Sequence, residues 1–208
     1  MTENPVFIVL TLVATGYIFN LWWQDYRAFR AGKEFGNPLP GASPVSLTWA
    51  VIGAVVALVI VGIETAGEIA LGVSDDQSTV VVISLIPFIC AGFMEELIFR
   101  GFAFYDKKGP KILWLSIIGA SLLFALAHFQ YYTEPVEGGS WWEKTLKIDP
   151  KSSWSLLILF VNSIWFYILR FAPTNTHRSL IPCFAAHIAS NVGVFIVKLA
   201  QGHVTGWL

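Results

Sequence analysis

The sequence has few charged residues for its length. Asp, Glu, Lys and Arg make up 13% of the 208 residues, about half the usual share in soluble domains. The formal net charge is only −1, so the chain lacks the basic excess that favours nucleic acid, and we expect no nucleic-acid partner. Hydrophobic residues reach 55% and the mean hydropathy is +0.64. Together these values predict a polytopic protein of the lipid bilayer.

Cysteine is nearly absent, and so are the marks of a secretory signal. The two cysteines, Cys90 and Cys183, both lie in apolar runs, where a thiol typically acts as a small buried hydrophobe. The N-terminal stretch MTENPVFIVLTLVATGYIFNLWW has no basic residue before its apolar run and no small-residue cleavage site after it. We therefore expect no disulfide framework, and we interpret the N-terminal stretch as a retained transmembrane helix.

Six segments are apolar and long enough to cross a bilayer, which requires about 20 residues. They predict an all-α fold, a polytopic integral membrane helical bundle of about six transmembrane helices. No internal repeat is visible. The approximate spans are 5–23, 46–66, 78–104, 112–131, 154–172 and 179–200.

Lysine and arginine are unevenly distributed among the predicted loops. Because short cytoplasmic loops collect positive charge, we expect a multi-pass protein of a bacterial-type cell membrane with both termini outside. The inner loops then hold Arg27, Arg30, Lys33, Lys107, Lys108, Lys111, Arg170 and Arg178, and the outer loops hold Lys144, Lys147 and Lys151. Aromatic residues near the span ends are typical of interfacial belts; they are Trp22, Trp23, Tyr131, Tyr132, Trp141, Trp142 and Trp154.

Several polar residues lie inside the predicted spans, where an ionised group costs at least about 2.5 kcal/mol to insert. Such residues are functional candidates by default. They are Glu95, Glu96 and Arg100 in the third span, His128 late in the fourth, and His187 and Asn191 in the sixth. Glu64 and Glu68, which close the second span, are instead expected at a solvated outer rim.

Helical spacing separates the two adjacent glutamates. Glu96 and Arg100 are four residues apart on one helical face and are predicted to pair. Glu95 points about 100° away from that face, so it is the carboxylate suited to proton transfer. An alternative is that all three residues form one buried ion network that holds helices together.

Two histidines strengthen the catalytic interpretation. His187 and Asn191 are four residues apart and project from one face of the sixth span. His128 comes from a different helix. One histidine on an apolar helix is typically a core residue, but two histidines with a free carboxylate and an amide favour a water-activating site.

Three short motifs resemble those of a known family. EELIFRG is similar to E-E-x-x-x-R, FALAH to F-x-x-x-H and HIASN to H-x-x-x-N, in the order found in the CPBP family of intramembrane proteases. This family is also called the CAAX protease and bacteriocin-processing, or Abi, family. The resemblance covers about residues 80–195, and it divides the chain into two N-terminal transmembrane helices, residues 1–70, and a CPBP-type catalytic core, residues 78–200.

The resemblance implies an intramembrane endopeptidase that acts on a peptide or membrane-protein substrate. The implied catalytic residues are Glu95, His128, His187 and Asn191, with Glu96 and Arg100 in support. It also implies either a metalloprotease, with zinc held by His128 and His187 and with Glu95 as a further ligand, or a glutamate peptidase without metal. Asn191 is the expected oxyanion donor, because amides are poor zinc ligands.

Two other function classes stay open. One is a non-catalytic membrane scaffold or regulator with the same fold, and the other is a proton-coupled transporter. The catalytic interpretation requires Glu95 and His128 to lie within about 10 Å of each other. Since His128 is far along the fourth span, we expect segment 101–111 to run as an interfacial stretch before that span begins.

Overall fold

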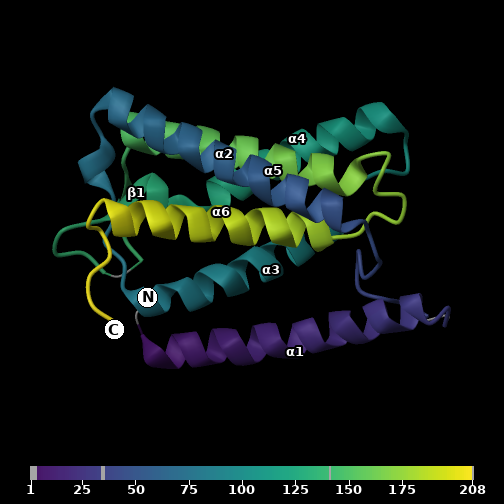
Figure 1. Ribbon diagram of the computed structural model, residues 1–208. Helices are drawn as coiled ribbons and strands as arrows, with labels where there is room; N and C mark the ends of the chain where they lie inside the picture. The colour runs from purple at the N-terminus through teal and green to yellow at the C-terminus, as the bar shows by residue number, and fades with distance from the viewer. Residues whose placement is uncertain (1–3, 34–35, 141, 208) are drawn as a thin grey trace.

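The computed structural model describes residues 4–33, 36–140 and 142–207. Within these residues the fold is almost entirely helical, as predicted (Figure 1). A two-stranded antiparallel hairpin, β1 (Thr133–Pro135) and β2 (Lys144–Leu146), pairs Thr133 with Leu146. The short helices are η1 (Ser74–Asp76), η2 (Val82–Ser84) and η3 (Phe129–Tyr131). The long helices are α1 (Pro5–Arg30), α2 (Leu47–Leu71), α3 (Leu85–Phe102), α4 (Pro110–Ala127), α5 (Pro150–Phe171) and α6 (Ile181–Ala200).

All six long helices found in the described residues are long and apolar enough to cross a membrane, which confirms the predicted multi-pass class. Their positions match the predicted spans to within a few residues at most ends. The exceptions are α1 and α2, which continue to Arg30 and Leu71, and α3, which is shorter than predicted. Arg27 and Arg30 therefore lie on the last turn of α1, where positive charge interacts favourably with the helix dipole.

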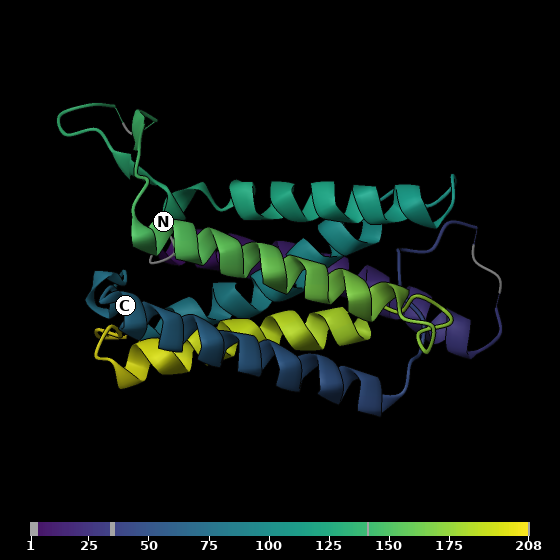
Figure 2. The same cartoon turned by 90° about the horizontal axis from the view of Figure 1, so that it is seen from above.

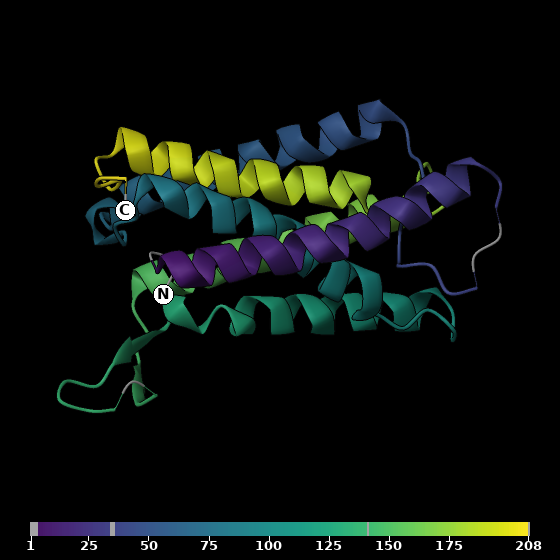
Figure 3. The same cartoon turned by 90° about the horizontal axis from the view of Figure 1, so that it is seen from below.

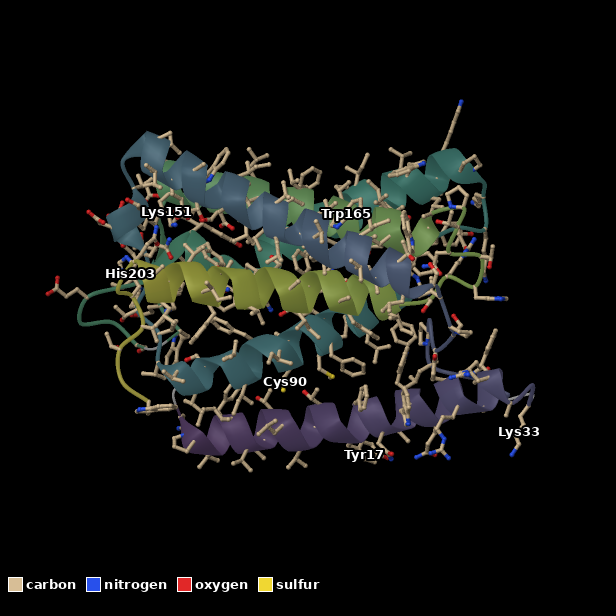
Figure 4. The ribbon with its side chains drawn as sticks, viewed as in Figure 1. Tyr17, Lys33, Cys90, Lys151, Trp165 and His203 are labelled. Carbon is tan, nitrogen blue, oxygen red and sulfur yellow. The ribbon has the colours of Figure 1, made fainter. Side chains whose placement is uncertain are left out.

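Consecutive helices run in opposite directions, so the loops gather at two ends of the bundle (Figures 1 and 2). We call the end with the β1–β2 hairpin the hairpin end. Figure 3 shows both termini at this end, and Figure 4 shows Lys151 and His203 there, with Lys33 at the opposite end. Which end faces the cytoplasm stays a prediction, as does the division into residues 1–70 and 78–200.

Several helix starts follow from local sequence. Asn4 and Asp149 act as N-caps of α1 and α5, where their side chains accept the N–H groups of Val6 and Ser152. A proline follows each cap at a position where the missing N–H costs nothing. Gly109, at φ +88°, turns the chain into α4. These signals set where the spans begin and therefore the level of each side chain in the bundle.

Aromatic side chains attach α1 to the rest of the bundle. Trp22 is buried, donates its Nε1–H to Pro40 O, and packs edge-on against Phe93 of α3 and Phe184 of α6. The prediction that Trp22 belongs to an interfacial belt is therefore wrong, because a helix that crosses the bundle buries one face. Trp154 is likewise engaged, since it donates to Glu64 O. Trp141 lies outside the described residues.

A charged network closes the hairpin end between α2, α5 and α6. Glu68 is buried, forms an ion pair with Lys151, and accepts a hydrogen bond from Gln77. Lys198 donates to Ser78 O at the same end. The prediction of a solvated rim is wrong for Glu68, because α2 continues far enough to carry this carboxylate into the helix interface, where Lys151 compensates its charge.

Candidate active site

The two glutamates of the EELIFRG motif lie on α3 where that helix closely approaches α6. Gly92, one turn before Glu96, permits the approach: a Cβ placed there would lie 2.8 Å from Ile188 Cγ1 and 3.2 Å from its backbone N. His187 is the residue before Ile188, and its Nδ1 lies 2.7 Å from Glu96 Oε1. Helix packing through a small residue thus brings the first and third motifs into direct contact.

Glu96 is the centre of a buried charged network. Its Oε1 accepts Arg100 Nη1–H at 3.0 Å, as the four-residue spacing predicted, and neither side chain is exposed. Arg100 Nη2 donates to Ser163 Oγ on α5 at 2.7 Å. The guanidinium also lies 4.5 Å from the ring centroid of Phe124, and it contacts the rings of Phe166 and Tyr167. Arg100 therefore joins α3, α4 and α5 around Glu96.

Glu95 faces the two histidines. Its Oε2 lies 3.7 Å from His128 Nε2 and 3.9 Å from His187 Nε2. This oxygen is buried and makes no hydrogen bond to any described residue. The separations exceed a direct hydrogen bond, so the three groups face one another without being locked together.

Hydrogen bonds at the far side of each ring determine the tautomers. His128 Nδ1 lies 2.8 Å from Phe124 O, which can only accept, so Nδ1 carries the proton. The same argument places a proton on His187 Nδ1, which faces the Glu96 carboxylate. In the neutral rings both Nε2 atoms are therefore unprotonated, and both point their lone pairs toward Glu95.

The segment between α3 and α4 explains how His128 reaches Glu95. Residues 103–109 are not helical, and Tyr105 N–H donates to Ser116 Oγ at 3.0 Å. Tyr105 therefore lies at the same height along the bundle as Ser116, which is more than one turn into α4. His128 lies about 18 Å beyond Ser116 along the helix. Glu95 lies a similar distance from Tyr105, about 11 Å of helix to Phe102 and then three non-helical residues.

Asn191 occupies a different position from the other predicted site residues. Its Nδ2 donates to Phe88 O at 2.8 Å and so ties α6 to the first turn of α3. Among the described residues, no hydrogen bond links Asn191 to Glu95, His128 or His187. Its predicted function as an oxyanion donor stays a prediction.

The sequence did not indicate Ser163. Asn162 and Ser163 are adjacent polar residues in the apolar VNSIW stretch of α5, and Ser163 makes the contact with Arg100. Asn162 is buried, and its Oδ1 has no hydrogen-bond partner within the described chain. Two adjacent polar residues in an apolar span indicate a polar contact. Which of the two side chains reaches Arg100 depends on the rotation of α5 about its axis.

The donor set includes groups that zinc accepts, two imidazole nitrogens and one carboxylate. Across the residues that the structure describes, however, no group of three or more His, Cys, Asp or Glu side chains is arranged to hold a metal ion. The site therefore does not fit a complete metal centre, and the reaction proposed for it uses no metal. The zinc prediction stays a prediction.

A family model described as "Type II CAAX prenyl endopeptidase Rce1-like" matches residues 77–193. The match includes all six predicted site residues and covers more than half of the chain. No curated protein and no solved structure matches the chain.

Proposed function

We propose that this chain, which belongs to the Rce1-like family of type II CAAX prenyl endopeptidases, cleaves its substrate with a water molecule activated by Glu95. The family is one of intramembrane endopeptidases, and the six apolar helices make this member a multi-pass membrane protein. The proposed substrate is a peptide or membrane-associated protein whose scissile bond reaches Glu95 within the bundle.

One observation carries the proposal. The Nε2 atoms of His128 and His187 converge on a buried Glu95 oxygen that makes no hydrogen bond to any residue the structure describes. A carboxylate without a compensating partner is costly away from water. The position of the Glu95 carboxylate beside two nitrogens that can accept protons therefore favours proton transfer over a purely structural function.

The proposed reaction proceeds in two steps. Glu95 removes one proton from a water molecule, whose other O–H donates to His128 Nε2, while the water oxygen attacks the peptide carbonyl carbon. The tetrahedral intermediate then breaks its C–N bond, and the proton held by Glu95 passes to the leaving nitrogen. Glu96 acts indirectly, because its bond to His187 Nδ1 fixes the tautomer that faces Glu95.

Cleavage by the purified protein in liposomes tests the proposal. The substrates are peptides with a C-terminal farnesylated cysteine motif, since the family description names a CAAX prenyl endopeptidase, and the same peptides without the lipid. We expect wild type to cleave and Glu95→Gln to lose at least about 100-fold in kcat, as expected for loss of a general base. His187→Ala should lose activity as well.

The matched control is Glu137→Gln, which removes an exposed carboxylate in the β1–β2 connection. It should cleave like wild type. Equal cleavage by wild type and Glu95→Gln would contradict the proposed mechanism. Absence of cleavage by wild type, with partner capture unchanged in Glu95→Gln, would instead favour a scaffold. Proton uptake by liposomes that Glu95→Gln abolishes would favour a transporter.

A further inference from the structure

The end of the bundle opposite the hairpin carries lysines that have no ion-pair partner. Lys107, Lys108 and Lys111 are exposed and lie close together where the chain turns into α4; we call them the lysine turn. None of the three forms an ion pair with a residue that the structure describes. The adjacent carboxylate, Asp106, is already paired with Arg178. The lysine turn is therefore a concentration of uncompensated positive charge at one end of a membrane helix.

The first turn of α4 is open to an anion. Gly109 precedes the helix without a side chain to cap it, and Pro110 has no N–H. Leu113 N–H donates to Gly109 O, but within the described chain the N–H groups of Lys111 and Ile112 have no acceptor. The starts of α1 and α5 differ, since a side chain accepts from each. Free N–H groups at the positive end of a helix dipole, beside three cations, favour a phosphate group.

An apolar groove leads away from the lysine turn along α4. It has a volume of about 440 Å³ and is lined by Pro110, Lys111, Trp114, Leu115 and Ile118; we call it the α4 groove. Trp114 is 47% exposed, Leu115 64% and Ile118 48%. Figure 2 shows α4 at the outer edge of the bundle, so this face meets lipid. From Lys111 to Ile118 the groove runs about 10 Å, which is room for part of one acyl chain.

We propose that one anionic phospholipid binds here, with its phosphate at the lysine turn and the start of α4, and with an acyl chain in the α4 groove. An anionic lipid matches both parts of the surface, because its phosphate compensates the unpaired cations and its chain covers the apolar side chains. A zwitterionic lipid would bring a cation of its own to the lysines. The inference does not depend on cleavage at Glu95.

Lipid competition tests the proposal with the full chain purified in detergent. Dioleoylphosphatidylglycerol and dioleoylphosphatidylcholine are added in equal amounts, and native mass spectrometry counts the lipids bound to each protein. We expect one phosphatidylglycerol to be retained, at least about tenfold more tightly than phosphatidylcholine. Lys111→Gln should lower that affinity about fivefold, as expected for one cation near a membrane surface. Lys33→Gln is the control and should change little, because Lys33 is exposed at the same end of the bundle but does not line the α4 groove.

Filling the α4 groove tests the position of the acyl chain. Ile118→Trp leaves the lysine turn intact and should lower the affinity for phosphatidylglycerol about tenfold, equivalent to the loss of about two buried CH₂ groups. Leu122→Trp is the control, since Leu122 is exposed on the same helix but does not line the groove. Both variants should unfold at the wild-type temperature without added lipid. Inorganic phosphate should not displace the bound lipid, because it cannot fill the groove.

Several results would overturn the inference. Equal retention of the two lipids would exclude a site for an anionic headgroup. An equal loss in Lys33→Gln and Lys111→Gln would indicate diffuse attraction to this end of the bundle. Unchanged binding in Ile118→Trp, or displacement by inorganic phosphate, would exclude the acyl chain from the α4 groove. Because none of these measurements uses cleavage, their outcome and that of the proposed function are independent.

Discussion

His187 lies between the two adjacent glutamates, with Nδ1 2.7 Å from Glu96 Oε1 and Nε2 3.9 Å from Glu95 Oε2. One imidazole thus contacts both glutamates, each through a different ring nitrogen, in keeping with the proposal that Glu96 is structural and Glu95 reactive. Glu96 is held by Arg100 and cannot move without breaking the buried network. Each glutamate has a buried Oε2 atom without a hydrogen-bond partner among the described residues, but only that of Glu95 faces the Nε2 atoms of both histidines.

Arg100→Met should strongly destabilise the protein. The change removes one partner of a fully buried ion pair and leaves Glu96 uncompensated, which typically costs about 3–5 kcal/mol. The measurement is thermal unfolding in detergent, followed by tryptophan fluorescence. Arg178→Met is the control, because the Arg178–Asp106 ion pair is partly exposed and its loss should change stability little. Similar losses in both variants would contradict the assignment.

Gly92→Ala should impair the site through helix packing. The added methyl group would meet Ile188, so α3 and α6 must separate and the contact between His187 and Glu96 must lengthen. A displacement of about 1 Å can reduce activity about 100-fold. The measurements are kcat and thermal stability. Gly119→Ala on α4 is the control: no atom lies within 4 Å of its Cβ position, and alanine there should be neutral or stabilising.

The zinc prediction is tested by metal content. If His128 and His187 hold zinc, the metal should copurify with wild type and be lost from His128→Ala, because one imidazole and one carboxylate form a much weaker site. His177→Ala is the control, since His177 is exposed in the loop before α6. Metal analysis of the purified variants gives the answer. Equal zinc content in wild type and His128→Ala would exclude His128 as a ligand.

The contribution of the Asp106–Arg178 pair should depend on pH. Its hydrogen bond to Arg178 lowers the pKa of Asp106, which lies outside the spans. Because the folded pKa lies below the unfolded value of about 3.9, the pair stabilises the fold above that pH and loses its effect as pH falls through the folded pKa. The difference in unfolding midpoint between wild type and Asp106→Asn should be constant from about pH 7 to 5 and shrink below about pH 4. A difference that grew on acidification would contradict this.

Much of the fold follows from local properties of the chain. A run of about 20 apolar residues can only bury its backbone polar groups in lipid as a helix, which is why six spans could be predicted. Their ends were less predictable. Glu68 resembles a rim residue in sequence, because the Lys151 that compensates it is supplied by α5, far along the chain.

In the candidate site, too, contacts within one helix could be predicted and contacts between helices could not. The four-residue spacing of Glu96 and Arg100 is a property of one helix, so their pairing could be predicted without knowledge of the other helices. Ser163 and Tyr131 belong to no motif. Their contacts with Arg100 and His128 depend on the rotation of α5 and on the turn after α4.

Hydropathy and residue spacing were enough to predict six membrane-spanning helices, the pairing of Glu96 with Arg100, and costly polar residues on three of the helices. The packing of the helices is what brings Glu95 to face His128 and His187 and directs the amide of Asn191 to Phe88. The difference arises from the distance along the chain over which each property acts. Hydropathy and helical spacing act within one segment, whereas the convergence of side chains depends on how closely Gly92 lets α3 approach α6 and on where the Tyr105–Ser116 contact sets α4.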